Sequence, residues 1–228
     1  MRQLTRPEIA QRAARDIPDG AYVNLGVGIP GLVAAAIGID REVVLHSENG
    51  ILGLGPPPLP GQEDPEVCDA SKKPATLVPG ASIFSHSESF LMIRGGHLDL
   101  CLLGAFQVSA AGDIANWKTV GGRRAPAVGG AMDLAVGARQ VWVLMEHTQK
   151  NGSPRLMRNC TYPLTAAGVV KRVYTDLCVL DVTDGGFVVC EMIADLTLDE
   201  LQSRTDAPLR VATDCRPLAA PSDMQHAR

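Results

Sequence analysis

The segment AYVNLGVGIPGLVAAAIGIDREVVLHSENG, residues 21–50, contains the pattern that determines the fold class. AYVNL is a strand by composition, and the glycine turn after it opens into a run of small residues typical of a helix. EVVLH is a second strand, and it ends abruptly in a polar turn. The order strand, glycine turn, helix, strand is the building unit of α/β proteins.

The same order recurs further along the chain. Two more buried strands and one glycine-opened helix are expected at LDLCLLGAF (98–106), QVWVLMEH (140–147) and GGAMDLAVGA (129–138). Continuous apolar strands that alternate with helices predict an open, largely parallel sheet flanked by helices on both faces. DLCVLDV and GFVVCEM surround Asp184-Gly185-Gly186, which predicts a small antiparallel hairpin near the C-terminus.

The two ends of the chain give further boundaries. Thr5 and Glu8 have the spacing of a capping box, and an apolar stripe follows them, so a short helix is expected there. LTLDELQSRT is expected to be a last amphipathic helix. We predict a single domain over residues 1–215 and a mobile tail over 216–228, because the tail lacks an apolar period.

The composition excludes several classes of protein. The chain has 228 residues, of which 46% are apolar and 20% charged, with a net charge of -4 and a pI near 5.7. This balance argues against a nucleic-acid or anionic-membrane surface, which needs clustered Lys and Arg. No apolar run is long enough for a membrane span or a signal peptide, so we expect a cytoplasmic protein. The six cysteines form no CxxC pair, which favours reduced thiols and no metal site.

The turn after the first strand, Gly26-Val27-Gly28, lies where backbone amides can approach an anion. It does not match a dinucleotide site well, since Pro30 interrupts it and no acidic residue ends the next strand. Close packing of the turn and an oxyanion-binding or acyl-binding role remain open. GILGLG (50–55) lacks the Gly-Lys-Ser/Thr of a phosphate loop, so a nucleoside triphosphatase is rejected.

Glu48 is the sharpest candidate for chemistry. Ligands of open α/β sheets bind at the carboxyl ends of the strands, and Glu48 lies about two residues past such an end. Asn24, Ser47 and Asn49 can donate hydrogen bonds, and apolar neighbours offer a dry wall. A poorly hydrated carboxylate there would be a better nucleophile than one in water. The alternative is a solvated loop acid.

Other polar residues carry weaker signals. His97, before a strand, is either a structural residue or a catalytic one. Two glycines that open a helix, Gly129 and Gly130, are candidate oxyanion donors. The basic pairs at 72–73 and 123–124 are either solvated or in contact with a phosphate-bearing ligand. No serine lies in a G-x-S-x-G motif, so a hydrolase triad has no support.

Five segments together resemble the B subunits of the family I 3-oxoacid CoA-transferases. They occur in the family's order and spacing between about residues 5 and 209: VNLGVGIP, LHSENGILGLGP, RGGHLDLCLLGAFQVS, GDIANW and VGGAMDLAVGA. GAFQVS with PAVGGAMDLA resembles the 3-oxoadipate enzymes more than the acetoacetate enzymes. The fold that the resemblance implies is the α/β CoA-transferase type.

The resemblance also implies roles for particular residues. Glu48 matches the family's catalytic nucleophile in S-E-N-G, and Gly129 matches an oxyanion-hole glycine. Asn24 matches a residue that lines the active site, and Asn49 and Gly50 are expected to contact substrate with it. CoA would pass from succinyl-CoA to 3-oxoadipate through a glutamyl-CoA thioester. CoA and acyl-CoA would be substrates, with no permanently bound cofactor and no metal.

The implied partner is a separate CoA-transferase A subunit in a heteromer, since the family works as two subunit types or as one fused chain. Two alternatives stay open. The first is acetoacetate as the acceptor, and the second is a non-catalytic ligand-binding α/β domain.

Overall fold

A computed structural model describes residues 2–38, 40–119 and 126–218 of the chain. The elements in chain order are α1 (Arg6–Asp16), β1 (Tyr22–Leu25), the 3-10 helix η1 (Pro30–Ala36), β2 (Val44–Ser47), β3 (Ile51–Leu54), β4 (Leu77–Ile83), α2 (His86–Arg94), β5 (Leu100–Leu103), β6 (Gln107–Ser109), β7 (Ile114–Ala115), α3 (Ala131–Gly137), β8 (Gln140–Leu144), β9 (Leu156–Met157), β10 (Val170–Tyr174), β11 (Cys178–Thr183), β12 (Gly186–Met192), α4 (Leu198–Gln202) and β13 (Leu209–Pro217).

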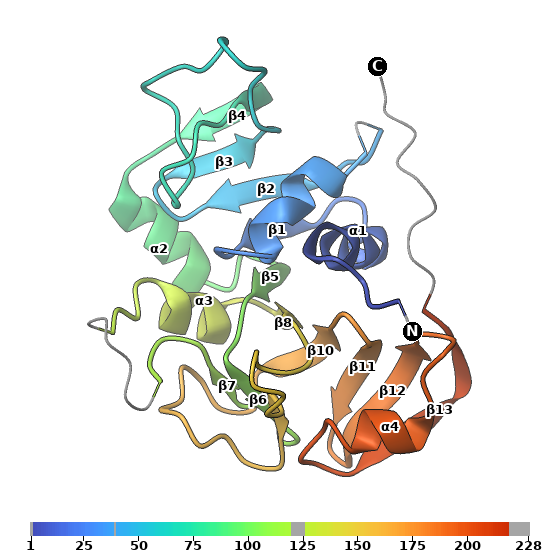
Figure 1. Cartoon of the computed structure of the whole chain (residues 1–228). Coiled ribbons are helices and arrows are strands. Elements are labelled where there is room, and N and C mark those ends of the chain that lie inside the picture. The colour runs from blue at the N-terminus through green and yellow to red at the C-terminus, as the bar shows by residue number, and fades with distance from the viewer. Residues whose placement is uncertain (1, 39, 120–125, 219–228) are drawn as a thin grey trace.

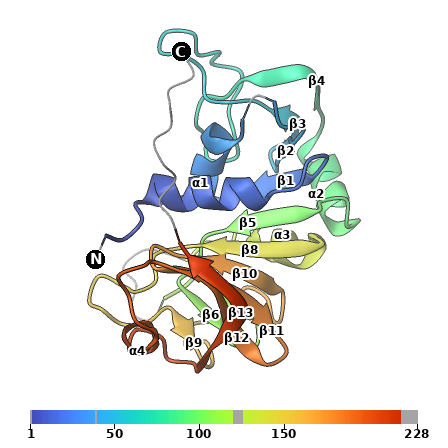
Figure 2. The same cartoon turned by 90° about the vertical axis from the view of Figure 1, so that its right-hand side faces the viewer.

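One large sheet runs through the whole molecule. Its strand order is β13-β12-β11-β10-β8-β5-β1-β2-β3-β4, and Figure 2 shows these strands stacked from one end of the molecule to the other. The five central strands β2, β1, β5, β8 and β10 are all parallel, so their carboxyl ends lie along one edge of the sheet. The predicted α/β fold with a largely parallel sheet is therefore confirmed.

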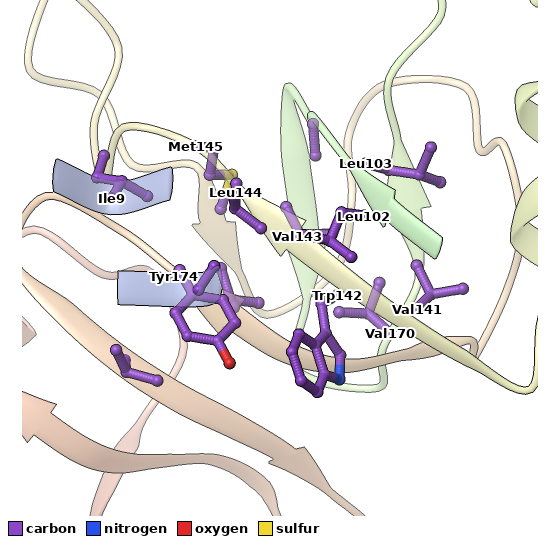
Figure 3. Close-up of a cluster of buried hydrophobic side chains, with 14 of the residues drawn as sticks. Ile9, Leu102, Leu103, Val141, Trp142, Val143, Leu144, Met145, Val170 and Tyr174 are labelled. Atoms are coloured by element: carbon purple, nitrogen blue, oxygen red, sulfur yellow. The ribbon is translucent and has the colours of Figure 1, made fainter. Parts of the chain in front are cut away.

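Helices cover the central strands on both sides, as the apolar strand pattern requires. Figure 1 shows α1 on one side and α2 with α3 on the other. All four residues of β5 are buried, because this strand lies in the middle of the sheet with helices over both of its faces. The core around β5, β8 and β10 is built mainly from aliphatic side chains together with Trp142 and Tyr174, and Ile9 of α1 belongs to the same cluster (Figure 3).

Local sequence signals were reliable where the element is self-contained. Thr5 accepts a hydrogen bond from the Glu8 amide, and the Glu8 side chain accepts one from the Thr5 amide, so the expected capping box is formed. The helix expected after Gly28 is present as the 3-10 helix η1.

One end of the sheet was predicted from the sequence and the other was not. The C-terminal hairpin of β11 and β12 is antiparallel, as predicted, and β13 then pairs parallel with β12. The other end carries an antiparallel addition, β3 and β4, that was not predicted from the sequence. A separate three-stranded sheet, β7-β6-β9, was also not predicted.

The C-terminal strand ends later than the boundary that we placed at residue 215. β13 extends to Pro217, and Leu218 is buried. The rest of the expected tail, residues 219–228, lies outside the described residues. Within the described ranges, no helix combines the length and the apolar character needed to cross a bilayer.

Candidate active site

Glu48 lies at the tip of the hairpin that joins β2 to β3. Ser47 pairs with Ile51, and the Gly50 amide donates to the Ser47 carbonyl at 2.9 Å, so three residues form the turn. Gly50 has a φ of 113°, and a Cβ at this position would overlap the carbonyl oxygen of Phe84. Glycine is therefore required here. Residues Ile51–Leu54 of the GILGLG segment form the strand β3.

A cavity of about 650 Å³ lies at the edge where the parallel strands end. The segments that follow β1, β2, β5 and β8 form most of its wall, as expected for an open α/β sheet. Residues that line it and that matter below are Asn24, Gly26, Glu48, Lys73, Gly129 and Gly130.

The Glu48 carboxylate is half-buried and forms no hydrogen bond or ion pair with any described residue. Burial raises the pKa of Glu48 above its ordinary value, nearby His86 opposes this, and Asp133 adds to it. A carboxylate that is poorly hydrated and unpaired retains its basicity when it is ionised. The position favours nucleophilic or general-base chemistry over a structural role.

Gly130 packs directly against this carboxylate. It is the N-cap of α3, and a Cβ added to it would overlap Oε2 of Glu48 and lie 3.1 Å from its Cδ and 3.0 Å from Cζ of Phe90. Gly129 lines the same cavity with a φ of 53°, a conformation that favours glycine. Gly130 thus brings main chain close to Glu48, where a side chain would exclude it.

Asn24 is held in place by a buried histidine. Its Nδ2 donates to the His46 carbonyl at 3.2 Å and lies 3.1 Å from Nδ1 of His46, while Nε2 of His46 lies 2.9 Å from Oγ of Ser89. Burial lowers the pKa of His46 to about 4, so the ring is neutral. Since Nδ1 accepts from Asn24, Nε2 carries the proton and donates to Ser89. This fixes the direction of the Asn24 amide.

The structure therefore brings together three of the five predicted site residues, Asn24, Glu48 and Gly129. Asn49 and Gly50 are not among the described residues that line the cavity. Nδ2 of Asn49 donates instead to the carbonyl of Cys68 at 2.8 Å. Direct contact of Asn49 and Gly50 with substrate stays a prediction.

The contacts of two residues of the site were not foreseen from the sequence. His46 was assigned only to a strand, and nothing local shows that it holds Asn24. Gly130 was noted with Gly129 as an oxyanion donor, but its approach to Glu48 was not foreseen. His46 could have been found from its place at the end of a strand, and Gly130 from its place in the glycine pair.

Two further expectations concern glycines and basic residues. A Cβ at Gly26 would lie 3.0 Å from the carbonyl oxygen of Leu102, so close packing of the turn requires this glycine. The pair Arg123-Arg124 lies outside the described residues. Among the residues that are described, no three His, Cys, Asp or Glu side chains form a group that could hold a metal ion.

Comparison with known proteins defines the class of protein to which this fold and cavity belong. The family model described as Coenzyme A transferase matches residues 6–201. The chain belongs to this family, and it is a CoA-transferase chain.

Individual members of this family and solved structures are also similar to the chain. The B subunit of the 3-oxoadipate CoA-transferase of Pseudomonas putida is 56% identical over 208 residues, which is 91% of this chain and 97% of the relative. The B subunit of a probable succinyl-CoA:3-ketoacid coenzyme A transferase of Bacillus subtilis is 45% identical over 207 residues, 91% of this chain and 95% of that one. The solved acyl-CoA transferase YdiF of Escherichia coli O157:H7 has a TM-score of 0.76 at 20% identity, over 95% of this chain and 44% of that one. This last similarity concerns the fold.

Proposed function

We propose that the chain is the B subunit of a CoA-transferase that moves CoA from succinyl-CoA to 3-oxoadipate, with Glu48 as the covalent carrier. The observation that supports this most directly is the unpaired Glu48 carboxylate in the cavity, where burial raises its pKa. The 56% identity to the B subunit of a 3-oxoadipate CoA-transferase supports the substrate.

The chemistry follows from a carboxylate placed beside a thioester. Ionised Glu48 attacks the carbonyl carbon of succinyl-CoA, the C–S bond breaks, and a mixed anhydride and CoA thiolate form. The thiolate then attacks the glutamyl carbonyl, which releases succinate and leaves CoA on Glu48 as a thioester. The 3-oxo acid's carboxylate enters by the reverse sequence and leaves as its CoA ester. CoA is never lost to water, since the carrier is the enzyme's own carboxylate.

Each of these steps passes through a tetrahedral oxyanion. The main chain at Gly130 lies beside the Glu48 carboxylate, and Gly129 lines the same cavity. Amide donors there would stabilise the developing charge by about 3 kcal/mol for each well-placed donor. Asn24, held by neutral His46, is the third polar group that we assign to the site. No step requires a metal or a redox cofactor.

A separate A subunit is the partner that we propose, because the similar bacterial chains are named as B subunits. The mixed anhydride must be shielded from water, and a partner chain over the cavity would do this. The reaction involves neither nucleic acid nor a membrane, and we expect it in the cytoplasm.

Acetoacetate is the second candidate acceptor. It is favoured by the 45% identity to a chain named for succinyl-CoA and 3-ketoacids. Comparing kcat/KM for 3-oxoadipate and acetoacetate with succinyl-CoA as the donor decides between them. A preference for acetoacetate would correct the substrate and leave the class unchanged.

The experiment that tests the mechanism is intact mass spectrometry after this chain and its A subunit, the proposed partner, are mixed with succinyl-CoA. We expect a CoA adduct on this chain that borohydride or hydroxylamine traps at Glu48 and that is absent in Glu48→Ala. Glu48→Ala should keep its fold and lose more than about 99% of the activity, as expected for a covalent nucleophile. An unmodified chain would favour a non-catalytic ligand-binding domain, and CoA release without an acceptor would indicate hydrolysis.

A further inference from the structure

The turn formed by residues 68–73 is attached to the chain on both sides of Glu48. The Ala70 amide donates to Oγ of Ser47 at 2.9 Å. Nδ2 of Asn49 donates to the Cys68 carbonyl at 2.8 Å. Both residues that flank Glu48 thus use their side chains to hold this turn, so the turn and the carboxylate keep a defined relative position.

The turn is also stabilised from within. Oδ1 of Asp69 accepts from the amides of Ser71 and Lys73 at 2.8 and 2.9 Å, and the Asp69 amide donates to the Lys73 carbonyl at 2.9 Å. Lys72, between them, has a φ of 62° and is the one described residue other than glycine with a positive φ. A lysine in this conformation costs free energy, which the surrounding hydrogen bonds offset.

This turn carries a cation into the wall of the cavity. Three basic residues line the cavity within the described ranges, namely Arg6, Lys73 and Arg155. Both arginines form ion pairs with Glu146, at 2.9 and 3.5 Å, whereas Lys73 forms none with any described residue. Among the described residues, Lys73 is therefore the cation of this wall that is available to a ligand.

The position of the three cations along the sheet edge also separates them. Glu146 follows β8, and β5 and β1 lie between β8 and β2, so the arginine pair is three strand spacings, about 14 Å, from the strand that carries Glu48. The two carboxyl carbons of a succinyl group are about 4 Å apart, and those of a 3-oxoadipyl group about 6 Å, from bond lengths near 1.5 Å. A cation for the far carboxylate must come from an element close to Glu48, and the 68–73 turn is such an element.

We propose that Lys73 determines specificity for dicarboxylic acyl groups by binding the carboxylate that does not react. This inference rests on the proposed function and deepens it. When the thioester carbonyl lies at Glu48, the Lys73 ammonium pairs with the far carboxylate of the succinyl or 3-oxoadipyl group. Ser47 and Asn49 are positioning residues that hold the turn for this contact. An acetoacetyl group has no far carboxylate and gains nothing from Lys73.

The test uses the first half-reaction, which needs no acceptor. This chain, as wild type or Lys73→Met, is combined with the A subunit, then mixed with succinyl-CoA or acetoacetyl-CoA, and the rate of CoA adduct formation is followed by intact mass. Lys73→Met should slow the reaction with subsaturating succinyl-CoA about 10-fold, the size of one charge-assisted contact, and leave acetoacetyl-CoA within about 2-fold. Lys73→Arg should restore the rate with succinyl-CoA.

Lys72→Met is the matched control, because it removes the same charge from the neighbouring residue, which does not line the cavity. It should behave as wild type with both thioesters. Equal losses with both thioesters in Lys73→Met, no loss with either, or the same selectivity change in Lys72→Met would overturn the role of Lys73. Failure of the wild type to form an adduct with any thioester would instead overturn the proposed function.

Discussion

Gly130→Ala tests whether free space beside the Glu48 carboxylate is needed for the reaction. Gly130 has φ near -80° and ψ near 0°, which alanine adopts without strain. The new methyl group would overlap Oε2 of Glu48 and lie 3.0 Å from Cζ of Phe90. The carboxylate is the more movable of these two groups, so it will be the one displaced.

The expected size of the effect follows from this overlap. Restoring ordinary van der Waals contact requires the carboxylate to move on the order of 1 Å, and a misplacement of this size costs roughly 100-fold in rate. This corresponds to a barrier higher by about 2.7 kcal/mol. The free energy of unfolding should change by less than about 1 kcal/mol, because the methyl group also restricts the unfolded chain.

The assay measures kcat for CoA transfer, the rate of adduct formation at Glu48, and the thermal midpoint of the variant complex. Gly31→Ala is the matched control, since Gly31 lines the same cavity and a Cβ there would meet only the Gly26 carbonyl oxygen at 3.5 Å. The control should retain wild-type kcat. If Gly130→Ala also retained wild-type kcat with an unchanged thermal midpoint, Glu48 would not react from the position that it has in this structure.

Three further outcomes follow from buried charges. Arg12→Ala should lower the free energy of unfolding by about 3 kcal/mol in urea denaturation, because buried Glu191 loses its bidentate partner at 2.7 and 2.8 Å and keeps only its pair with the more exposed Arg216. Glu48→Gln should raise the thermal midpoint at pH 7 while abolishing transfer, because the raised pKa of Glu48 means that folding disfavours its ionised form. Burial lowers the pKa of His46 and His147 to about 4, so unfolding takes up protons below pH 6.5. The free energy of unfolding should thus fall by about 3 kcal/mol per histidine as the pH drops from 6.5 to 4. His147→Gln should make this fall smaller, as measured by urea denaturation at several pH values.

The central strands were predictable because a strand that is buried on both faces has a continuous run of apolar residues. Every residue of β5 is buried, and its sequence is a continuous apolar run. The strands at the edges of the sheet have no such apolar run. β4 is mostly exposed, and its pairing with β3 joins residues about thirty positions apart, so the pairing depends on the assembled sheet.

The candidate site divides in the same way. Glu48 was predictable because the carboxyl ends of parallel strands meet at one edge, and its own strand ends just before it. Gly130 and His46 act through contacts with Glu48 and Asn24 that only the folded chain creates. The sequence marks the residue that we propose to react, and the residues that surround it are recognised from the geometry.

Neighbouring residues of the turn after β2 have different roles. Ser47 and Asn49 hold the 68–73 turn, and Glu48 lines the cavity. A carboxylate in a hairpin ordinarily accepts hydrogen bonds from nearby side chains, and such bonds would lower its pKa and its reactivity. Here Ser47 and Asn49 direct their side chains to the backbone of the 68–73 turn. The hydrogen bonds that build the cavity wall are therefore the same ones that leave Glu48 without a partner. Asn49→Ala would remove one of these hydrogen bonds and loosen the wall.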